Sequence, residues 1–144
     1  MFRSLVATAA TVLALPAGAE SLASPHSVAE TMDRLVAAVE GAGATVMARV
    51  DHTEGARSVE MDLPEAQLLI FGNPKVGTPI MQQDLRAGLI LPLRVLVHEG
   101  DGGTMITWQS PEEMFAGLDV DPGSEPVKLA AGALEKLTAK AAEE

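Results

Sequence analysis

The N-terminal segment limits what this chain can fold into more than any other feature. Met1-Phe2-Arg3 is followed by an apolar stretch over residues 5–15 and by Ala17-Gly18-Ala19, an A-x-A type cleavage site. The apolar run is shorter than the ~18 to 20 residues that a membrane anchor needs, so a secretory signal peptide is predicted over residues 1–19. The remaining residues 20–144 contain no cysteine. We therefore expect a periplasmic or secreted domain that is stabilised by packing alone, without stable membrane insertion after cleavage.

The composition excludes several classes of protein. A hydrophobic content of 47% and a mean hydropathy of +0.20 indicate a globular chain rather than a disordered one. Lys and Arg number 10 against 20 Asp and Glu, and loss of Arg3 changes the formal charge from -10 to -11. Nucleic acid is therefore an unsuitable partner. The absence of cysteine excludes thiolate metal sites and covalent haem attachment, and neither a cofactor nor a metal is predicted.

The pattern of elements predicts an α+β fold. Ser27-Val28-Ala29-Glu30 has the form of a capping box and starts a helix that runs to Glu40. Alternation predicts a strand over residues 45–51, and four consecutive apolar residues place a strand covered on both faces at residues 67–71. Helices would cover one face of this strand, and either a subunit interface or a loop layer would cover the other. Shorter helices are expected over residues 51–60, at 78 to about 86, and after Ser110.

The C-terminal part predicts a hairpin and a terminal helix. Residues 93–99 and 104–109 alternate around the glycine-rich turn at 100–103. A helix over about residues 125–142 presents one apolar stripe, made of Val127, Ala130, Leu134, Leu137 and Ala141. The expected architecture is a single-domain α/β sandwich over residues 20–144, with its core over about residues 24–118. About four to five strands in one sheet would be packed by helices.

Phe71 to Met81 is the most distinctive stretch of the sequence. It reads as a strand, a glycine-rich turn over residues 72–77, and a helix that starts at Thr78-Pro79. Free amides at such a helix N-terminus, together with Lys75, could hold an anion. A nucleotide phosphate loop is disfavoured because Lys75 lies inside the turn rather than after its second glycine. The alternative is that the glycines and prolines only shape a tight connection and Lys75 is solvated.

This stretch resembles the family of domain of unknown function 302 (DUF302), through the string Phe71-Gly72-Asn73-Pro74-Lys75-Val76-Gly77-Thr78. Supporting matches lie at residues 24–28, 48–52, 69–81 and 91–97, and the resemblance ends at about Pro111. It implies a small α/β sandwich and no established reaction. Members often begin with a strand, which the resemblance predicts to be short or missing here, because cleavage leaves only residues 20–23 before the Ser24-Pro25-His26 segment.

Three further polar residues are candidates for a site. His52 follows a predicted strand and could bind a metal or haem or move a proton, although capping or a buried hydrogen bond is the alternative role. Arg49 and Arg94 stand among apolar strand residues, and their guanidinium groups would meet on one side of the sheet if the two strands were neighbours. The alternative for both is an internal ion pair with Asp51, Asp84 or Glu99.

The sequence favours a non-catalytic module that binds a small ligand or an anion. Its candidate ligand-binding residues are Arg49, His52, Asn73, Lys75, Gly77, Thr78 and Arg94. Neither G-x-S-x-G nor H-E-x-x-H occurs, so no catalytic residue is assigned. One alternative is a structural or partner-binding homodimer, with Trp108 as an interface or core anchor. Another is an enzyme or a metal- or haem-binding protein that uses His52.

Overall fold

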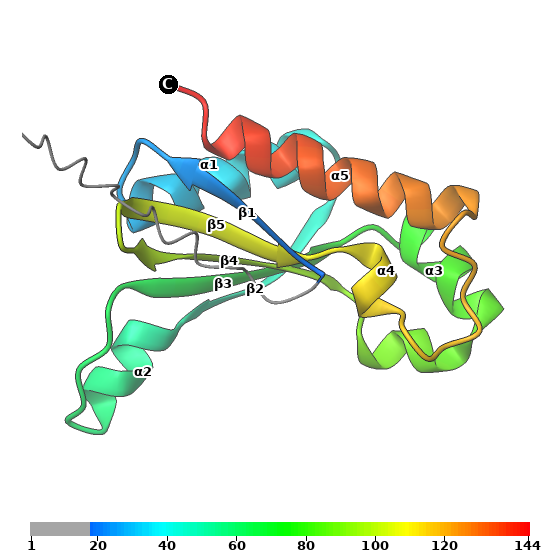
Figure 1. Ribbon diagram of the computed structural model, residues 1–144, viewed down its shortest axis with the longest axis horizontal. Coiled ribbons are helices and arrows are strands. Elements are labelled where there is room, and N and C mark those ends of the chain that lie inside the picture. The colour runs from blue at the N-terminus through cyan, green and yellow to red at the C-terminus, as the bar shows by residue number, and fades with distance from the viewer. Residues whose placement is uncertain (1–17) are drawn as a thin grey trace, which may run out of the picture.

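The computed structural model describes residues 18–144, so the predicted signal peptide lies outside the described residues except for Gly18 and Ala19. The strands are β1 (Ala19–Ser24), β2 (Thr45–Asp51), β3 (Ala66–Gly72), β4 (Leu93–Gly100) and β5 (Gly103–Gln109). The helices are α1 (Val28–Gly41), α2 (His52–Ser58), α3 (Pro74–Gln83), α4 (Pro111–Met114) and α5 (Glu125–Ala141), with a 3-10 helix η1 (Leu85–Leu89) after α3 (Figure 1).

The strands form one antiparallel sheet in the order β1-β5-β4-β3-β2. Helices α1 and α5 lie side by side over one face of this sheet (Figure 1). The predicted α+β class, the C-terminal hairpin of β4 and β5, and the terminal helix α5 are all confirmed.

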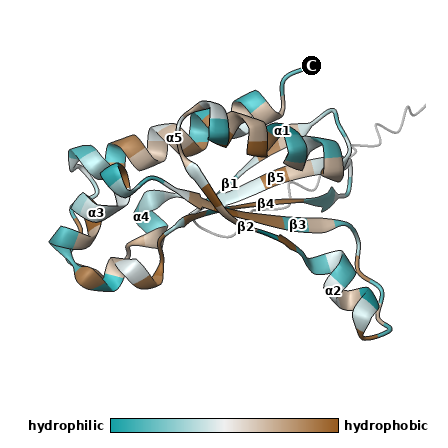
Figure 2. Cartoon of the chain, turned by 180° about the vertical axis from the view of Figure 1, so that it is seen from behind, coloured by the Kyte–Doolittle hydropathy of each residue, from teal (hydrophilic) through white to brown (hydrophobic). Residues whose placement is uncertain are grey.

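The core lies between this face and the two helices. Side chains alternate along each strand, so every second residue of β3, β4 and β5 is directed toward α1 and α5. The side chains of Leu69, Val95, Val97 and Ile106 are fully buried there, and Phe71 nearly so. From the helices, Met32, Leu35, Val39 and Leu134 complete the same cluster. Hydrophilic and hydrophobic residues alternate along α5 accordingly (Figure 2).

The other face of the sheet is covered by no helix within residues 18–144, so helices supply one of the two layers expected over β3. We call it the open face. In the registers of the five strands it carries Ala48, Val50, Leu68, Ile70, Arg94, Leu96, His98, Met105, Thr107 and Ser21. Leu68, Ile70 and Leu96 are half-buried rather than buried. The apolar run of β3 therefore has one face packed against helices and one face that no helix covers.

The first strand, expected to be short or missing, is present with six residues and is the shortest of the five strands. Strand β1 pairs with β5 over its whole length, from Ala19 opposite Gln109 to Ser24 opposite Thr104. The segment that follows is anchored as well, because Ser24 Oγ and Thr31 Oγ1 are 2.7 Å apart in the core. His26 Nε2 lies 2.6 Å from the carbonyl oxygen of Glu143. This contact holds the residues that follow α5 beside the segment between β1 and α1. Pairing with an available edge outweighs the weak strand pattern of these few residues.

The predicted start of the third helix is also wrong. Helix α3 begins at Pro74 with Asn73 as its N-cap, rather than at Thr78-Pro79, and Pro79 lies inside it. The sequence offers two successive starts of the same kind, a capping side chain followed by proline. The first one prevails, and the residues between them become its first turn. Ser27, Asp51 and Ser110 cap α1, α2 and α4 as predicted.

The two faces of β3 give a direct test of the core. Leu69→Ala is expected to lower the free energy of unfolding by roughly 2 to 5 kcal/mol, because it leaves a cavity beneath α1 and α5. Leu68→Ala, on the open face of the same strand, is the matched control and should cost about 1 kcal/mol. Urea unfolding of both variants, at a protein concentration low enough for the chain to be a monomer, measures the difference. Equal losses, or a larger loss for Leu68→Ala, would contradict the assignment of faces.

Candidate functional site

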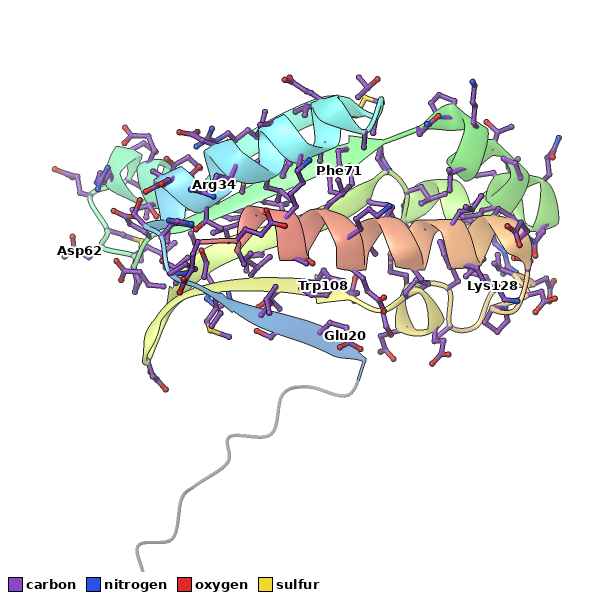
Figure 3. All side chains as sticks on the ribbon, turned by 90° about the horizontal axis from the view of Figure 1, so that it is seen from above. Glu20, Arg34, Asp62, Phe71, Trp108 and Lys128 are labelled. Atoms are coloured by element: carbon purple, nitrogen blue, oxygen red, sulfur yellow. The ribbon has the colours of Figure 1, made fainter. Side chains whose placement is uncertain are left out.

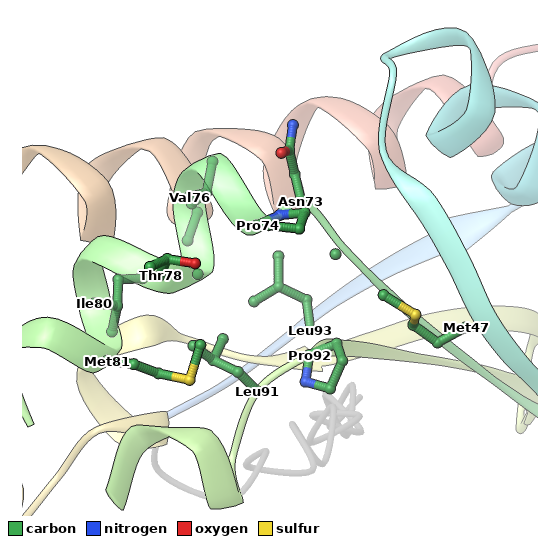
Figure 4. A pocket seen from close by; sticks show the side chains of 13 residues that line it. Met47, Asn73, Pro74, Val76, Thr78, Ile80, Met81, Leu91, Pro92 and Leu93 are labelled. Atoms are coloured by element: carbon green, nitrogen blue, oxygen red, sulfur yellow. The ribbon is translucent and has the colours of Figure 1, made fainter. Parts of the chain in front are cut away.

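A pocket lies between α3 and the start of β4 (Figure 4). Its volume is about 210 Å³, and it is apolar. Helix α3 and the residues before it supply most of the wall, and the Leu91-Pro92-Leu93 segment supplies the side opposite. The lining residues are Met47, Gly72, Asn73, Pro74, Val76, Gly77, Thr78, Ile80, Met81, Leu91, Pro92, Leu93 and Ala130. Two strings of the resemblance, at residues 69–81 and 91–97, therefore meet at one site.

The first turn of α3 satisfies its own amides. Pro74 has no N–H, and the Lys75 N–H donates to Asn73 Oδ1 at 3.0 Å. The N–H groups of Val76 and Gly77 both donate to the backbone carbonyl of Asn73 at 2.9 Å. An anion at this helix N-terminus would have to displace these bonds. The observed geometry thus gives no support to the anion-holding turn expected from the sequence.

Thr78 supplies the polar group of the pocket. Figure 4 shows its hydroxyl directed into the space bounded by Leu91 and Leu93, whereas the Asn73 amide is directed away from that space. The Asn73 side chain is already engaged as the cap of α3. The pocket therefore offers apolar walls and one hydroxyl, which can donate or accept a hydrogen bond. Because an apolar cavity of about 150 Å³ holds benzene, this one can hold a somewhat larger molecule.

Two glycines leave space in the wall formed by α3 and the residues before it. A Cβ on Gly72 would lie 3.3 Å from the Cβ of Pro92, a close contact. A Cβ on Gly77 would lie 3.8 Å from Leu91 Cδ1, at ordinary van der Waals distance, and would be directed toward the pocket. Neither glycine has a positive φ. Their role here is to leave space rather than to allow a special backbone conformation.

Three of the predicted site residues, Asn73, Gly77 and Thr78, line the pocket. Lys75 lies in the same helical turn but is exposed and does not line it. Asn73, Gly77 and Thr78 therefore meet at one site, whereas the predicted basic side chains of Lys75, Arg49 and Arg94 do not line it.

Arg49 and Arg94 lie on opposite faces of the sheet, because Arg49 is opposite Leu69 and Arg94 is opposite Ile70, and these adjacent residues of β3 point to different faces. Arg49 is on the helix side, where its Nη1 lies 2.6 Å from Asp33 Oδ1 of α1 and its Nε donates to Gln67 Oε1 at 2.8 Å. The internal pairing expected as the alternative is therefore present for Arg49, but with a different carboxylate. Arg94 is exposed on the open face, where its Nη2 donates weakly to the Ile90 carbonyl at 3.5 Å.

His52 is the first residue of α2 and is exposed. It lies on the element that projects away from the body of the molecule, far from α3 (Figure 1). Within residues 18–144 no group of three His, Asp or Glu side chains is placed to hold a metal ion. Trp108 is on the helix side, opposite Glu20, and packs against the core (Figure 3).

Sequence reasoning missed the apolar wall of the site. Val76 and Ile80 are four residues apart, the spacing of one helix face, which would have identified the first turn had the helix been started at Asn73-Pro74. Met47 and Ala130 come from β2 and α5, far away in the sequence. Nothing local in the sequence points to these two residues, because the tertiary fold alone brings them to the pocket.

Asp84 connects the end of α3 to the segment before α5. Its carboxylate accepts from Arg86 Nη2 at 2.7 Å and from the Arg86 backbone N–H at 2.9 Å. It also accepts from the Asp119 N–H at 2.9 Å. These hydrogen bonds, above all those from the Arg86 side chain, hold the pKa of Asp84 well below its usual value, and the same pairing raises the pKa of Arg86.

The model of the DUF302 family, a domain of unknown function, matches residues 20–143. The chain therefore belongs to the DUF302 family. The crystal structure of an uncharacterized conserved DUF302 protein from Bacillus stearothermophilus has a TM-score of 0.72 and 22% identity, covering 88% of this chain and 97% of that one. At this identity the likeness establishes a shared fold.

Curated relatives carry another description. Proteins from Brucella suis and Brucella abortus, each described as fluoride-specific ion channel FluC 1, are 42% identical to this chain over 98 residues, or 67% of it. The match spans 39% of the first protein and 36% of the second. The chain thus spans less than half the length of these relatives. Among residues 18–144, none of the helices has the length and apolar character needed to cross a membrane.

The Asp84 contacts predict a pH dependence. Because the folded-state pKa is lowered, the stabilisation is fully present above the usual value of 3.8 and is lost as the pH falls below it. Asp84→Asn should lower the Tm at neutral pH, and the difference from the unchanged protein should shrink in acid. Asp119→Asn, whose exposed carboxylate lies 4.0 Å from Arg86, is the control and should change the Tm little. Thermal melts across this pH range would contradict the account if the Asp84→Asn deficit were absent or independent of pH.

Proposed function

We propose that this protein is a non-catalytic binding module for a small, mainly apolar molecule, held in the pocket between α3 and the Leu91-Pro92-Leu93 segment. The pocket itself carries the proposal: about 210 Å³ of apolar space with the Thr78 hydroxyl at its wall. Small-molecule sites combine apolar walls with few polar groups in this way. An open apolar pocket leaves apolar surface in contact with water, which costs free energy. An apolar ligand would remove this surface from water.

The first-turn amides and Lys75 favour an apolar ligand over an anionic one. The amide of Lys75 and those of the next two residues are already bonded to Asn73, and the Lys75 side chain is exposed outside the pocket. An anion-binding role remains the alternative proposal, and the description of the Brucella relatives as fluoride-specific ion channels is what favours it. The two alternatives differ in the probe that should bind.

Indole is a suitable first probe, because it has an apolar body a little larger than benzene and one N–H that can donate to Thr78 Oγ1. Titration followed by amide NMR should shift the signals of Gly77, Thr78 and Leu93 together. Gly77→Leu fills the space opposite Leu91 and is expected to abolish these shifts. Lys75→Ala, in the same turn but outside the pocket, is the matched control and should bind indole normally.

Either of two results would count against the apolar ligand. Unchanged indole shifts in Gly77→Leu would place the binding elsewhere on the protein. If sodium fluoride, and not indole, moved the signals of residues 75–77, the anion-binding alternative would replace the proposal.

We also propose that the protein acts after export, in the periplasm or outside the cell. The signal-peptide pattern supports this, and so does the position of its cleavage site, because the family match starts at residue 20. Cleavage after Ala19 leaves five of the six residues of β1 for pairing with β5. Intact-mass measurement of protein from the exported fraction should give a chain that starts at Glu20. A full-length chain confined to the cytoplasm would contradict export.

A further inference from the structure

The open face of the sheet differs in charge from the rest of the molecule. The chain contains 20 acidic residues, yet none of the open-face positions on the described strands is Asp or Glu. The three acidic residues within strands, Glu20, Asp51 and Glu99, all fall in the register of the helix side. The open face instead carries half-buried Leu68, Ile70 and Leu96, with exposed Arg94 at one end.

At the other end of these strands an arm projects from the sheet. We define the arm as residues 52–65, that is, α2 and the segment that returns to β3. It extends beyond the sheet on the side away from α5 (Figures 1 and 2), and Asp62 lies at its far end (Figure 3). The arm is firmly based, because Thr53 Oγ1 donates to the Pro64 carbonyl at 3.1 Å and accepts from the Ala66 N–H at 2.9 Å.

The arm exposes apolar and acidic side chains together. Val59, Met61 and Leu63 are 63%, 65% and 45% exposed, an unusual concentration for a monomer surface. The same segment carries four exposed carboxylates, at Glu54, Glu60, Asp62 and Glu65, against one arginine.

The opposite end of the molecule is complementary to the arm. Leu85 and Leu89 of η1 are 81% and 86% exposed. Arg94 is nearby, since its guanidinium reaches the carbonyl of Ile90, the residue that follows η1. Among residues 18–144 Arg94 forms no ion pair. One end of the open face is thus apolar and acidic, and the other is apolar and cationic.

We propose that the open face, the arm and η1 form the interface with a second copy of this chain. A two-fold axis that runs across the strands places the arm of each copy over the Arg94 end of its partner, so both contacts are made twice. Asp62 and its neighbours then face the partner's Arg94, while the apolar residues of the arm pack against those of η1.

The available area is adequate for such a dimer. Five strands of about six residues form a face roughly 24 Å by 20 Å, or about 480 Å². With the arm and η1 added, each copy approaches the roughly 800 Å² per partner of a standard stable interface.

Sedimentation velocity of the purified protein tests this interface, from micromolar to hundreds of micromolar concentration. The unchanged protein should be a dimer, and Arg94→Glu should raise its Kd by about tenfold to hundredfold, because like charges are then opposed. Asp62→Arg alone should weaken the dimer similarly, and the double variant should restore it. Leu129→Glu is the control: this residue is 51% exposed on α5, on the other side of the molecule, and should not matter.

Three results would overturn the proposal. The first is a monomer at every concentration. The second is a dimer that Arg94→Glu leaves intact or that the double variant does not restore. The third is a dimer that dissociates with Leu129→Glu, which would place the contact on the helix side. Arg94, Asp62 and Leu129 are all exposed, so circular dichroism should show an unchanged fold in each variant.

Discussion

Removal of one row of strand side chains from water is the constraint on which the rest of this structure depends. Leu69, Phe71, Val95, Val97 and Ile106 form that row, and α1 and α5 are the amphipathic helices that cover it. Without disulfides this burial has to supply most of the stability. Because both helices cover the same face of the sheet, the half-buried leucines of the other face remain in contact with solvent. The arm and η1 extend the apolar surface on that side, and we assign this surface to a second copy.

The position of α3 follows from the same arrangement. The helix extends from the end of β3 and packs beside α5. Its apolar side meets the Leu91-Pro92-Leu93 segment without filling the space between them. The missing side chains of Gly72 and Gly77 leave part of this space open, and Thr78 adds one hydroxyl. The residues that identify the DUF302 family in this chain thus build a pocket rather than a phosphate-type loop.

Much of the fold could be predicted from the sequence, because local signals were strong and agreed with each other. The Ser27 capping box, the alternation over residues 45–51 and the glycine turn of the hairpin all predicted elements that the structure contains. The start of α3 was predicted wrongly because the sequence contains two possible helix starts close together. Asn73-Pro74 and Thr78-Pro79 are starts of the same kind, and the helix begins at the first, with Asn73 as its N-cap. Whether β1 forms could not be predicted from its few residues, because its pairing with β5 decides it.

The candidate site was predictable only in part, because its members come from four separate segments. The motif located Asn73, Gly77 and Thr78, whereas Met47 and Ala130 reach the pocket through the tertiary fold. Native mass spectrometry of the protein, purified from cells that make it, shows whether the pocket holds a ligand. One small molecule should be retained per chain and should be lost from the Gly77→Leu variant. A chain that carries no additional mass in any preparation, or one retained equally by Gly77→Leu, would contradict the account.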